Sequence, residues 1–303
     1  MSDEIANWPT GQVGFVSIVG RPNVGKSSFL NTVLDFHLSA VSNKPQTTRK
    51  NWRGILSDEK SQIVFIDTPG AHIGNSQLSE TMLEDIFRTL NDVDVLLCMA
   101  DPSREPGKED KMIAERVAES HRKKILLINK IDIAEPAQIA ETKAFYLEIL
   151  DDVPVFEISA QDRKSLDPVL DAIRAELSTG PFFYDPEQVT DSYTRDIGAE
   201  LIREASLNLL RKEVPHSIAI EIDQWKESEN KLKIAATIFV ERKSQKLIVI
   251  GKNGDMLKQI KRDAITALKD IIDVRIDLKL HVKVASDWRN KKDFMSNLRI
   301  INE

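Results

Sequence analysis

The chain has 303 residues, 41% of them apolar and 30% charged, with a formal net charge of −6 at pH 7. The length suggests about two domains, and the composition is that of a globular protein able to bury a sizeable core. The single cysteine, Cys98, excludes a disulfide framework, and the longest uncharged apolar run, residues 95–100, is far shorter than a membrane span. Without a signal-peptide pattern at the start, we expect a soluble, cytoplasmic protein, and we leave open a peripheral contact with the inner face of the cell membrane.

Short apolar runs alternate with helical patterns over the first 180 residues. The runs are expected as strands buried on both faces, near 13–19, 63–67, 94–100, 124–129 and 153–159. The amphipathic segments are expected as helices, near 26–35, 79–91, 107–121, 135–150 and 165–178. This alternation predicts an α/β domain with a mostly parallel sheet and flanking helices, in which 51–58 pairs antiparallel with 62–67.

A glycine-rich loop, GRPNVGKS, follows the first predicted strand and precedes a helical pattern. It fits G-x-x-x-x-G-K-[ST] in its strand–loop–helix context, where backbone N–H groups and the helix dipole bind phosphates. We expect Lys26 to reach the β- and γ-phosphates and Ser27 to ligate Mg²⁺. The predicted phosphate-binding residues are Gly20, Arg21, Pro22, Asn23, Val24, Gly25, Lys26, Ser27 and Ser28.

Two further motifs are typical of a pocket that senses the terminal phosphate. DTPG ends the strand predicted at 63–67, so Asp67 is placed to hold Mg²⁺ through water, and Gly70 can donate its N–H to the γ-phosphate. In the polar loop 44–50, KPQTTRK, a threonine can ligate Mg²⁺ when the triphosphate is bound, and we favour Thr48 over Thr47. The residues expected to line this part of the pocket are Asp67, Thr68, Pro69, Gly70 and Ala71.

NKID follows the strand predicted at 124–129, on the same edge of the sheet as the phosphate loop. A carboxylate accepts two hydrogen bonds from guanine, whereas adenine would leave Asp132 desolvated and unpaired, at a cost of about 1–3 kcal/mol. The pattern therefore favours GTP and GDP over ATP. The residues expected to bind the base are Asn129, Lys130 and Asp132, with Ser159, Ala160 and Gln161 of the SAQ segment.

The stretch 178–187 is rich in glycine and proline and is expected to link two domains. We predict one domain over 1–180, a linker over 181–187 and a second domain over 188–303. In the second domain we expect helices near 190–212 and 254–271, strands near 214–225, 231–240 and 274–285, and a short strand-like run at 246–251.

The second domain differs from the first in charge. Residues 181–303 hold 22 Lys and Arg against 20 Asp and Glu. Within 242–262, seven basic residues stand against Asp255 alone. Such a stripe can attract a phosphate backbone although the whole chain is acidic.

The motifs GRPNVGKS, QTTR, DTPG, NKID and SAQ stand in the order and at roughly the spacing of the translation-factor-related GTPases. Within that class the chain resembles the Era family of bacterial GTPases over residues 10–300. The resemblance implies a GTP-hydrolysing domain followed by an α+β KH domain of type II that binds 16S ribosomal RNA. It also implies a monomer that assists the maturation and assembly of the small (30S) ribosomal subunit.

The position directly after D-x-x-G is Ala71, where small signalling GTPases carry a glutamine that orients the attacking water. We therefore expect slow intrinsic hydrolysis. The resemblance implies K⁺ as a stimulating ion with Asn23 as its ligand, since a cation there would neutralise charge between the phosphates. Arg21 and Arg49 are further candidates for charge stabilisation. The residues expected to carry catalysis are Asn23, Lys26, Thr48 and Gly70.

GKNG, residues 251–254, is the candidate RNA clamp. In KH domains a G-x-x-G loop holds the backbone of about four nucleotides, because glycines let the sugar–phosphate chain touch the loop. The helix that follows would point its positive end at the phosphates. The residues expected to bind RNA are Gly251, Lys252, Asn253, Gly254, Lys258, Lys261 and Arg262.

Several questions stay open at this point. The tail 286–299 either stacks bases with its aromatic residues or folds back on the domain. GTP is expected to order the loops 36–50 and 68–80 and thereby to expose or mask the RNA groove. The alternative functions are a signalling GTPase with a protein-docking or membrane-surface module, and an ATP-driven enzyme.

Overall fold

The computed structural model describes residues 8–42, 44, 47–71, 76–298 and 300. The chain forms two compact units, which we call the first unit and the second unit. The first unit comprises Met1–Leu38, Asn51–Ile73 and Met82–Asp191. The second unit comprises Ser39–Lys50, Gly74–Thr81 and Ser192–Glu303, so it includes two short segments from the first half of the sequence.

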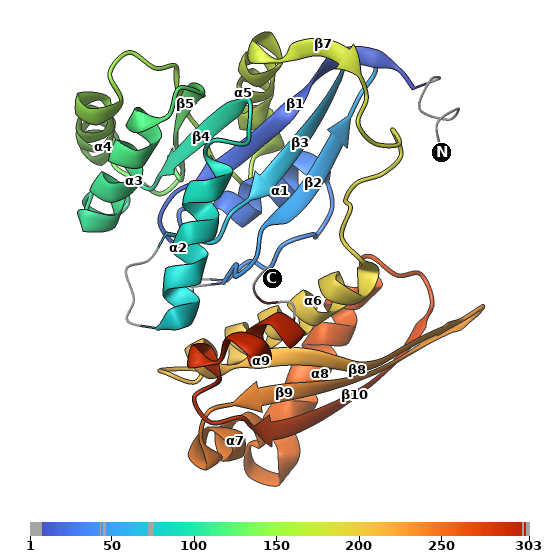
Figure 1. Cartoon of the computed structure of the whole chain (residues 1–303). Coiled ribbons are helices and arrows are strands. Elements are labelled where there is room, and N and C mark those ends of the chain that lie inside the picture. Colours follow the sequence, from blue (N-terminus) through green and yellow to red (C-terminus); the bar gives the residue numbers. More distant parts are fainter. Residues whose placement is uncertain (1–7, 43, 45–46, 72–75, 299, 301–303) are drawn as a thin grey trace. The chain divides into compact units, whose positions relative to one another are not determined.

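The first unit is built on a twisted sheet with the strand order β2-β3-β1-β4-β5-β6 (Figure 1). The strands from β3 to β6 run parallel along this path, and β2 pairs antiparallel with β3, as the sequence predicts. The strands are β1 (Thr10–Val19), β2 (Trp52–Ser57), β3 (Ser61–Asp67), β4 (Val95–Ala100), β5 (Lys123–Ile128), β6 (Val155–Glu157) and β7 (Ser178–Pro181).

Helices cover both faces of this sheet, which explains why the middle of β3 and the whole of β4 are apolar and buried. On one face lie α1 (Lys26–Leu34) and α5 (Arg163–Glu176). On the other face lie α2 (Gln77–Thr89) from Met82 on, α3 (Lys108–Glu119) and α4 (Pro136–Leu150). Apolar side chains of these three helices form one core cluster with the strands.

The stretch that we expected to be a linker begins with a strand. Ser178–Pro181 forms β7, which pairs antiparallel with the start of β1. The next residue, Phe182, is buried, and the side chain of Gln62 accepts the backbone N–H groups of Phe183 and Tyr184 at 2.7 and 2.9 Å. The composition of 178–187 indicated a turn-rich segment but not these partners, which lie more than 100 residues earlier in the chain.

The second unit packs helices against a three-stranded sheet of order β10-β9-β8 (Figure 1). Strands β8 and β9 are antiparallel, whereas β9 and β10 are parallel. Helices α6 and α8 pack against each other and against the edge strands β8 and β10. The elements are α6 (Thr194–Leu209), β8 (Ala219–Ser228), β9 (Lys231–Val240), α7 (Lys243–Ile250), α8 (Asp255–Lys269), β10 (Arg275–Val284), α9 (Lys292–Asn297) and short 3₁₀ turns at Pro215–Ser217, Lys252–Gly254 and Trp288–Asn290.

The expectation of a strand-like run at 246–251 was wrong, because these residues belong to helix α7 and its end. The side chain of Gln245 accepts the backbone N–H groups of Glu241 and Arg242, both at 2.9 Å, and so caps the start of the helix. The helix ends where the N–H of Gly251 donates to the carbonyl of Leu247 at 2.9 Å. Such caps, together with tertiary packing, outweigh the strand propensity of an Ile-Val-Ile run.

The C-terminal tail folds back on the second unit, which decides between the two alternatives above. Trp288 is buried, and its indole N–H donates to the carbonyl of Ser217 at 2.7 Å. Arg289 donates two hydrogen bonds to the carboxylate of Glu241, and the Phe294 ring meets Phe239 edge to face with centroids 5.1 Å apart. Trp288 is therefore a packing residue and is not placed to stack on RNA bases.

No helix within residues 8–42, 44, 47–71, 76–298 and 300 is long and apolar enough to cross a bilayer.

Replacing Leu278 with alanine tests the packing of the second unit. Leu278 is fully buried on β10, so Leu278→Ala should lower the free energy of unfolding by about 2–5 kcal/mol. Leu247→Ala is the matched control, because Leu247 is 71% exposed and its truncation should change stability by less than about 0.5 kcal/mol. Urea unfolding followed by tryptophan fluorescence measures both, and equal effects would contradict this packing.

Candidate functional site

The carboxyl ends of the parallel strands meet at one edge of the first-unit sheet, and the predicted nucleotide motifs follow them. The phosphate loop begins at Gly20 directly after β1, and Asp67 is the last residue of β3. Asn129 follows β5 directly, and Ser159 comes two residues after β6. Ligands of open α/β sheets bind at this edge, so the fold brings the separate motifs to one place.

The phosphate loop depends on Gly25, which has a positive φ of 108° and forms the N-cap of α1. A Cβ at this position would lie only 2.1 Å from the amide nitrogen of Asn129. That amide nitrogen donates to the carbonyl of Val24 at 2.7 Å, and the Asn129 Oδ1 accepts the N–H of Ala160 at 2.8 Å. Asn129 thus connects the phosphate loop to the SAQ loop, and the missing Cβ of Gly25 makes this contact possible.

Lys26 lies within the phosphate loop and is buried. Its Nζ donates to the carbonyls of Gly20 and Arg21 at 3.0 and 3.1 Å. Burial lowers the pKa of Lys26 to about 8, and the nearby Asp67 carboxylate acts in the opposite direction. A cationic side chain held by the loop backbone is suited to meet the negative charge of phosphates.

Two of the three predicted metal ligands meet in the first unit. The Ser27 hydroxyl donates to the carboxylate of Asp67 at 2.8 Å. A hydroxyl and a carboxylate are oxygen donors of the kind that Mg²⁺ prefers. The structure therefore fits a Mg²⁺ ion held by Ser27 and Asp67.

DTPG is anchored to the phosphate loop. The Thr68 hydroxyl donates to the carbonyl of Ile18 at 2.7 Å, and the N–H of Ala71 donates to the carbonyl of Gly20 at 3.2 Å. Ala71 is buried and has only a methyl side chain, so it cannot orient water. Of the loop 68–80, residues 72–75 lie outside the described residues, as do 43, 45 and 46 of the loop 36–50.

The base-binding motif shows one buried and one exposed part. Asn129 is buried, whereas Asp132 is exposed. Lys130 donates to the carboxylate of Asp101 at 2.7 Å, which fixes the direction of the lysine side chain. Burial alone would raise the pKa of Asp101, but hydrogen bonds from Lys130 and Ser103 hold the pKa below its usual value.

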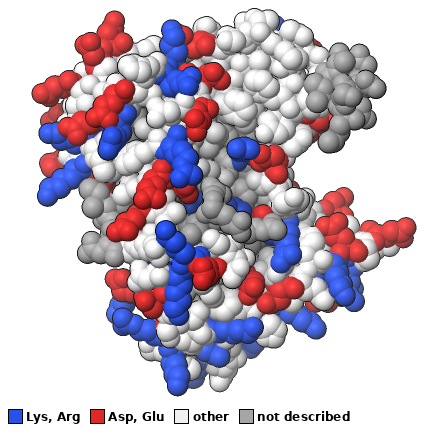
Figure 2. All heavy atoms as spheres, viewed as in Figure 1, with Lys and Arg blue, Asp and Glu red and all other residues white. Residues whose placement is uncertain are grey.

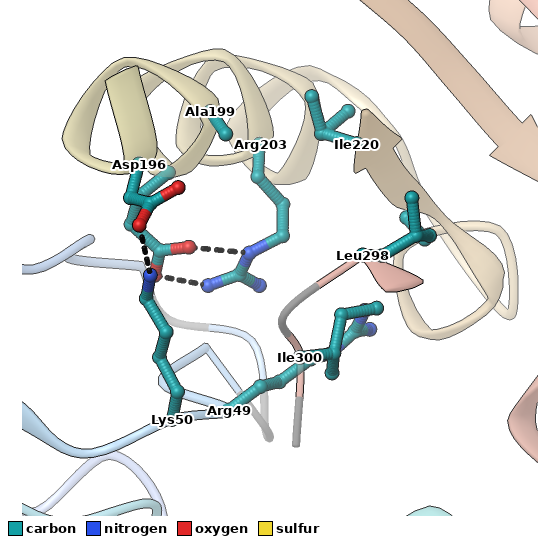
Figure 3. Close-up of a pocket in the computed structure, with 10 residues that line it drawn as sticks. Arg49, Lys50, Asp196, Ala199, Arg203, Ile220, Leu298 and Ile300 are labelled. Carbon is teal, nitrogen blue, oxygen red and sulfur yellow. Dashed lines mark hydrogen bonds and ion pairs between the residues drawn. The ribbon is translucent and has the colours of Figure 1, made fainter. Parts of the chain in front are cut away.

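Thr48 and Arg49 belong to the second unit, together with Thr47 and Lys50. The Arg49 guanidinium lies over the ring of Trp288, 5.3 Å from its centroid, and donates to the carbonyl of Ile218 at 2.6 Å. Lys50 forms an ion pair with Asp196 of α6 at 3.8 Å (Figure 3). Arg49 is therefore engaged by residues of its own unit.

A small pocket of about 50 Å³ lies beside these residues. It is lined by Arg49, Lys50, Asp196, Arg203 and Ile220, among others (Figure 3). Arg203 donates to Glu200, its neighbour on α6, and to the carbonyl of Thr47. The segment 47–50 is thus held by side chains of α6.

The candidate RNA clamp joins α7 to α8. Gly251, Asn253 and Gly254 all have positive φ values, of 74°, 55° and 78°. A Cβ on Gly251 would lie 2.6 Å from the Cβ of Met256, whereas a Cβ on Gly254 would meet no described residue within 4 Å. Gly251 is therefore needed for local packing, while the backbone at Gly254 faces open space.

The predicted basic residues surround this turn. Lys258 donates to the carbonyl of Asn253 at 3.3 Å and pairs with Asp255 at 3.2 Å. Lys252 and Arg262 are exposed, and Lys261 is half-buried. Leu247 and Ile248 of α7 are exposed apolar side chains close in sequence to the turn. Figure 2 shows many Lys and Arg side chains over the second unit, around α7 at the bottom of the view.

Comparisons with known proteins agree with this geometry. A family model described as "50S ribosome-binding GTPase" matches residues 15–130, and a KH domain model matches residues 213–289. GTPase Era of Clostridium acetobutylicum is 42% identical over 285 residues, covering 94% of this chain and 96% of that protein. GTPase Era of Clostridium botulinum, strain Eklund 17B, is 40% identical over 286 residues, covering 94% and 97%.

The chain belongs to the Era family of GTPases. A crystal structure of a point variant of Aquifex aeolicus Era bound to GDP·AlF₄⁻ is similar, with a TM-score of 0.91, 33% identity and coverage of 96% of this chain and 100% of that one. A crystal structure of Era with MgGDPNP and nucleotides 1506–1542 of 16S ribosomal RNA has the same TM-score and coverage at 32% identity. The expected fold class, a P-loop GTPase domain followed by a KH domain, is confirmed, as is membership of a GTP-hydrolysing family.

Sequence analysis missed two residues of the segment after β4 that hold parts of the Era-family motifs in place. Asp101 binds Lys130, and Arg104 donates to the carbonyl of Pro22 at 3.1 Å. Asp101 comes directly after a fully apolar strand, at the same sheet edge as Asp67 and Asn129. This acidic residue directly after an apolar strand was the sequence feature that could have indicated a role at the site.

Asn129 and Asp132 should have separable roles. Asn129→Ala leaves the buried carbonyl of Val24 and N–H of Ala160 without this partner, so we expect a loss of about 1–3 kcal/mol in the stability of the nucleotide-free protein. Asp132→Ala should change that stability by less than about 0.5 kcal/mol, because the side chain is exposed. Both variants should bind GDP at least about tenfold more weakly. Urea unfolding and GDP titration check this, and unchanged stability in Asn129→Ala would refute the bridging role.

Proposed function

We propose that this protein is a GTP-switched RNA-binding factor that binds 16S ribosomal RNA and assists the maturation of the 30S ribosomal subunit. The observation that carries the proposal is the left-handed turn at 251–254, open at Gly254 and preceding α8, in a chain that also carries a complete set of guanine-nucleotide motifs. Its relatives are named GTPase Era, and one solved relative holds nucleotides 1506–1542 of 16S ribosomal RNA.

In the nucleotide pocket, some residues bind the phosphates and others bind the base. Backbone N–H groups of Gly20–Ser27 bind the phosphates, Lys26 supplies a cation at their end, and Asp132 accepts two hydrogen bonds from guanine. Ser159–Gln161 meets the guanine oxygen through its backbone. Asn129 holds the two ends of this pocket at a fixed separation, because it bonds to both loops.

Ser27 and Asp67 would hold Mg²⁺, and Thr48 would add a hydroxyl when GTP is present. Mg²⁺ in such a site neutralises charge on the β- and γ-phosphates. Gly70 donates its N–H to the γ-phosphate, so the backbone of DTPG senses whether that group is there. This assignment leaves no side chain of DTPGA to orient the attacking water, which is consistent with slow hydrolysis.

In the RNA site, the turn at 251–254 would clamp the sugar–phosphate backbone, and the N-terminus of α8 would face the phosphates. The side chains of Lys252, Lys258, Lys261 and Arg262 add attraction that salt screens. The exposed Leu247 and Ile248 offer apolar surface to unstacked bases. Asp255 is the acidic residue at this helix start, and its pairing with Lys258 offsets part of its charge.

The work of such a factor would take place in the cytoplasm, where its RNA is found, and a monomer with one clamp would suffice. The second candidate function, a module that docks on the inner face of the cell membrane, rests on the same basic surface of α7 and α8. RNA is favoured because the left-handed turn offers backbone contacts, which a membrane surface does not require.

Gly254 gives the sharpest test of RNA binding. Aspartate and asparagine have the same shape and both tolerate a positive φ, and the site has room for either side chain. Gly254→Asp places a negative charge beside the phosphates, so its affinity for an RNA of nucleotides 1506–1542 should fall at least about tenfold below that of Gly254→Asn. Fluorescence anisotropy over a range of salt concentrations measures both.

Equal RNA affinities of the two variants would refute the clamp, and binding to anionic lipid vesicles in place of RNA would favour the membrane alternative. The same titration in GDP and in a non-hydrolysable GTP analogue tests the switch. A nucleotide can change the affinity for RNA only if it binds one conformation of the protein better than another. Equal RNA affinity with both nucleotides would therefore mean that the nucleotide site and the RNA site are not coupled.

We expect a potassium ion to neutralise charge between the phosphates and so to accelerate GTP hydrolysis. We expect GTP turnover to be at least about tenfold faster in KCl than in NaCl of equal ionic strength, which corresponds to about 1.4 kcal/mol of transition-state stabilisation. Asn23 has a positive φ of 65°, so Asn23→Gly removes the carboxamide while allowing the same backbone. This variant should show equal rates in the two salts. Equal GTP turnover of the unmodified protein in KCl and NaCl would contradict a role for potassium.

A further inference from the structure

The side chain of Arg21 in the phosphate loop is directed toward α3 and the segment after β4. Its guanidinium donates to the carboxylate of Asp110 at 2.6 Å. It also donates to three backbone carbonyls of the segment after β4, at Asp101, Arg104 and Glu105, over 3.3 to 3.4 Å. Arg21 is therefore engaged by α3 and the loop before it, and it is not the charge stabiliser that we considered from the sequence.

Asp110 receives three donors in a buried position. One carboxylate oxygen accepts from Arg21 and from the N–H of Gly107, at 2.6 and 2.9 Å. The other oxygen accepts the hydroxyl of Tyr146 at 2.6 Å. Asp110 and Tyr146 are each only 1% exposed. The carboxylate is thus fixed in position from three sides.

Tyr146 of α4 completes this cluster. Burial, together with nearby Cys98 and Asp110, raises the pKa of Tyr146 well above its usual value, so its hydroxyl remains a donor at any physiological pH. Burial likewise raises the pKa of the Cys98 thiol to about 12, which makes Cys98 a neutral neighbour. The cluster is therefore an ion pair of Arg21 with Asp110 to which a neutral phenol donates a hydrogen bond.

The phosphate loop is linked to this cluster by its own backbone. The carbonyl of Arg21 accepts from Nζ of Lys26 at 3.1 Å, so the residue that is held by Asp110 also holds the phosphate-binding lysine. In a second link, the donor belongs to the segment after β4 and the acceptor to the phosphate loop: Arg104 donates to the carbonyl of Pro22 at 3.1 Å. A shift of Arg21 would move the loop and its lysine together.

We propose that Asp110 and Tyr146 are positioning residues for the binding of guanine nucleotides, which hold the phosphate loop in its binding geometry through the side chain of Arg21. This inference rests on the proposed nucleotide pocket. It assigns a role to two residues of α3 and α4 that lie outside every nucleotide motif in the sequence.

The competing explanation is an ion pair that stabilises the fold and does nothing else. Breaking a buried pair destabilises a protein whether or not a ligand site is near. The two explanations differ in which part of the nucleotide loses affinity. A positioning role weakens the contacts to the phosphates, whereas general destabilisation lowers affinity for base and phosphates alike.

The test compares GDP with GMP, since the gain of GDP over GMP comes from the terminal phosphate in the loop. Affinities of the full chain for both are measured by competition with a fluorescent GDP analogue. Asp110→Asn should lower the affinity for GDP about tenfold and Tyr146→Phe about threefold, with the affinity for GMP unchanged. Glu119→Gln is the matched control, because it is the same kind of acid-to-amide change on α3, at an exposed ion pair with Arg116.

A double-mutant cycle tests whether Asp110 acts through Arg21. Arg21→Gln combined with Asp110→Asn should bind GDP no more weakly than Arg21→Gln alone. Additive losses, or equal losses of GDP and GMP affinity, would overturn the positioning role. Tyr146→Phe keeps the ring and removes only the hydroxyl, so it keeps the test informative where Asp110→Asn fails to fold, and an unchanged GDP affinity in Tyr146→Phe would count against the inference. Unmodified protein that retains no GDP would overturn the proposed function itself.

Discussion

The nucleotide pocket depends on the close approach of Asn129 to the phosphate loop. The amide of Asn129 reaches the carbonyl of Val24 because Gly25 has no side chain in the way. Through its oxygen the same amide holds Ala160, so the loops that would meet the phosphates and the base have a fixed separation. A pocket whose two ends are fixed before binding loses less entropy when the nucleotide enters.

Side chains that donate to main-chain carbonyls shape the rest of this pocket. A loop has no ladder of backbone hydrogen bonds, so its carbonyls need other donors when they are buried. Lys26, Arg21, Arg104 and Asn129 supply such donors to the phosphate loop or to the segment after β4. The conformation of the phosphate loop is therefore specified by residues from several strand–helix units, each placed near the end of a strand or helix.

The parts of the site that the sequence predicted are those whose chemistry is local. GRPNVGKS is recognisable from its own glycines and the helix that follows, even though side chains from other strand–helix units also hold the loop. The strands were marked by apolar runs that the two helical layers bury. The direction of the Arg21 side chain was not predictable, because Asp110 and the carbonyls that attract it come from a different strand–helix unit. For the same reason β7 was missed and the folding back of the tail stayed one of two alternatives: the contacts of Gln62 with Phe183 and of Trp288 with Ser217 and Arg49 join residues far apart in sequence.

The two glycines of GKNG show how structure can separate a packing requirement from a binding requirement. Both have positive φ values, so sequence alone treats them alike. Gly251 faces Met256 at a distance that excludes any Cβ, which is reason enough for glycine there. Among the residues that the structure describes, Gly254 has no neighbour within 4 Å of a Cβ, so their packing does not require the absence of a side chain. Its positive φ accounts for part of the preference, but asparagine at 253 shows that this turn accepts a side chain at a similar φ. The proposed RNA clamp would account for the rest, because a glycine at residue 254 would let a phosphate backbone approach the N-terminus of α8 most closely.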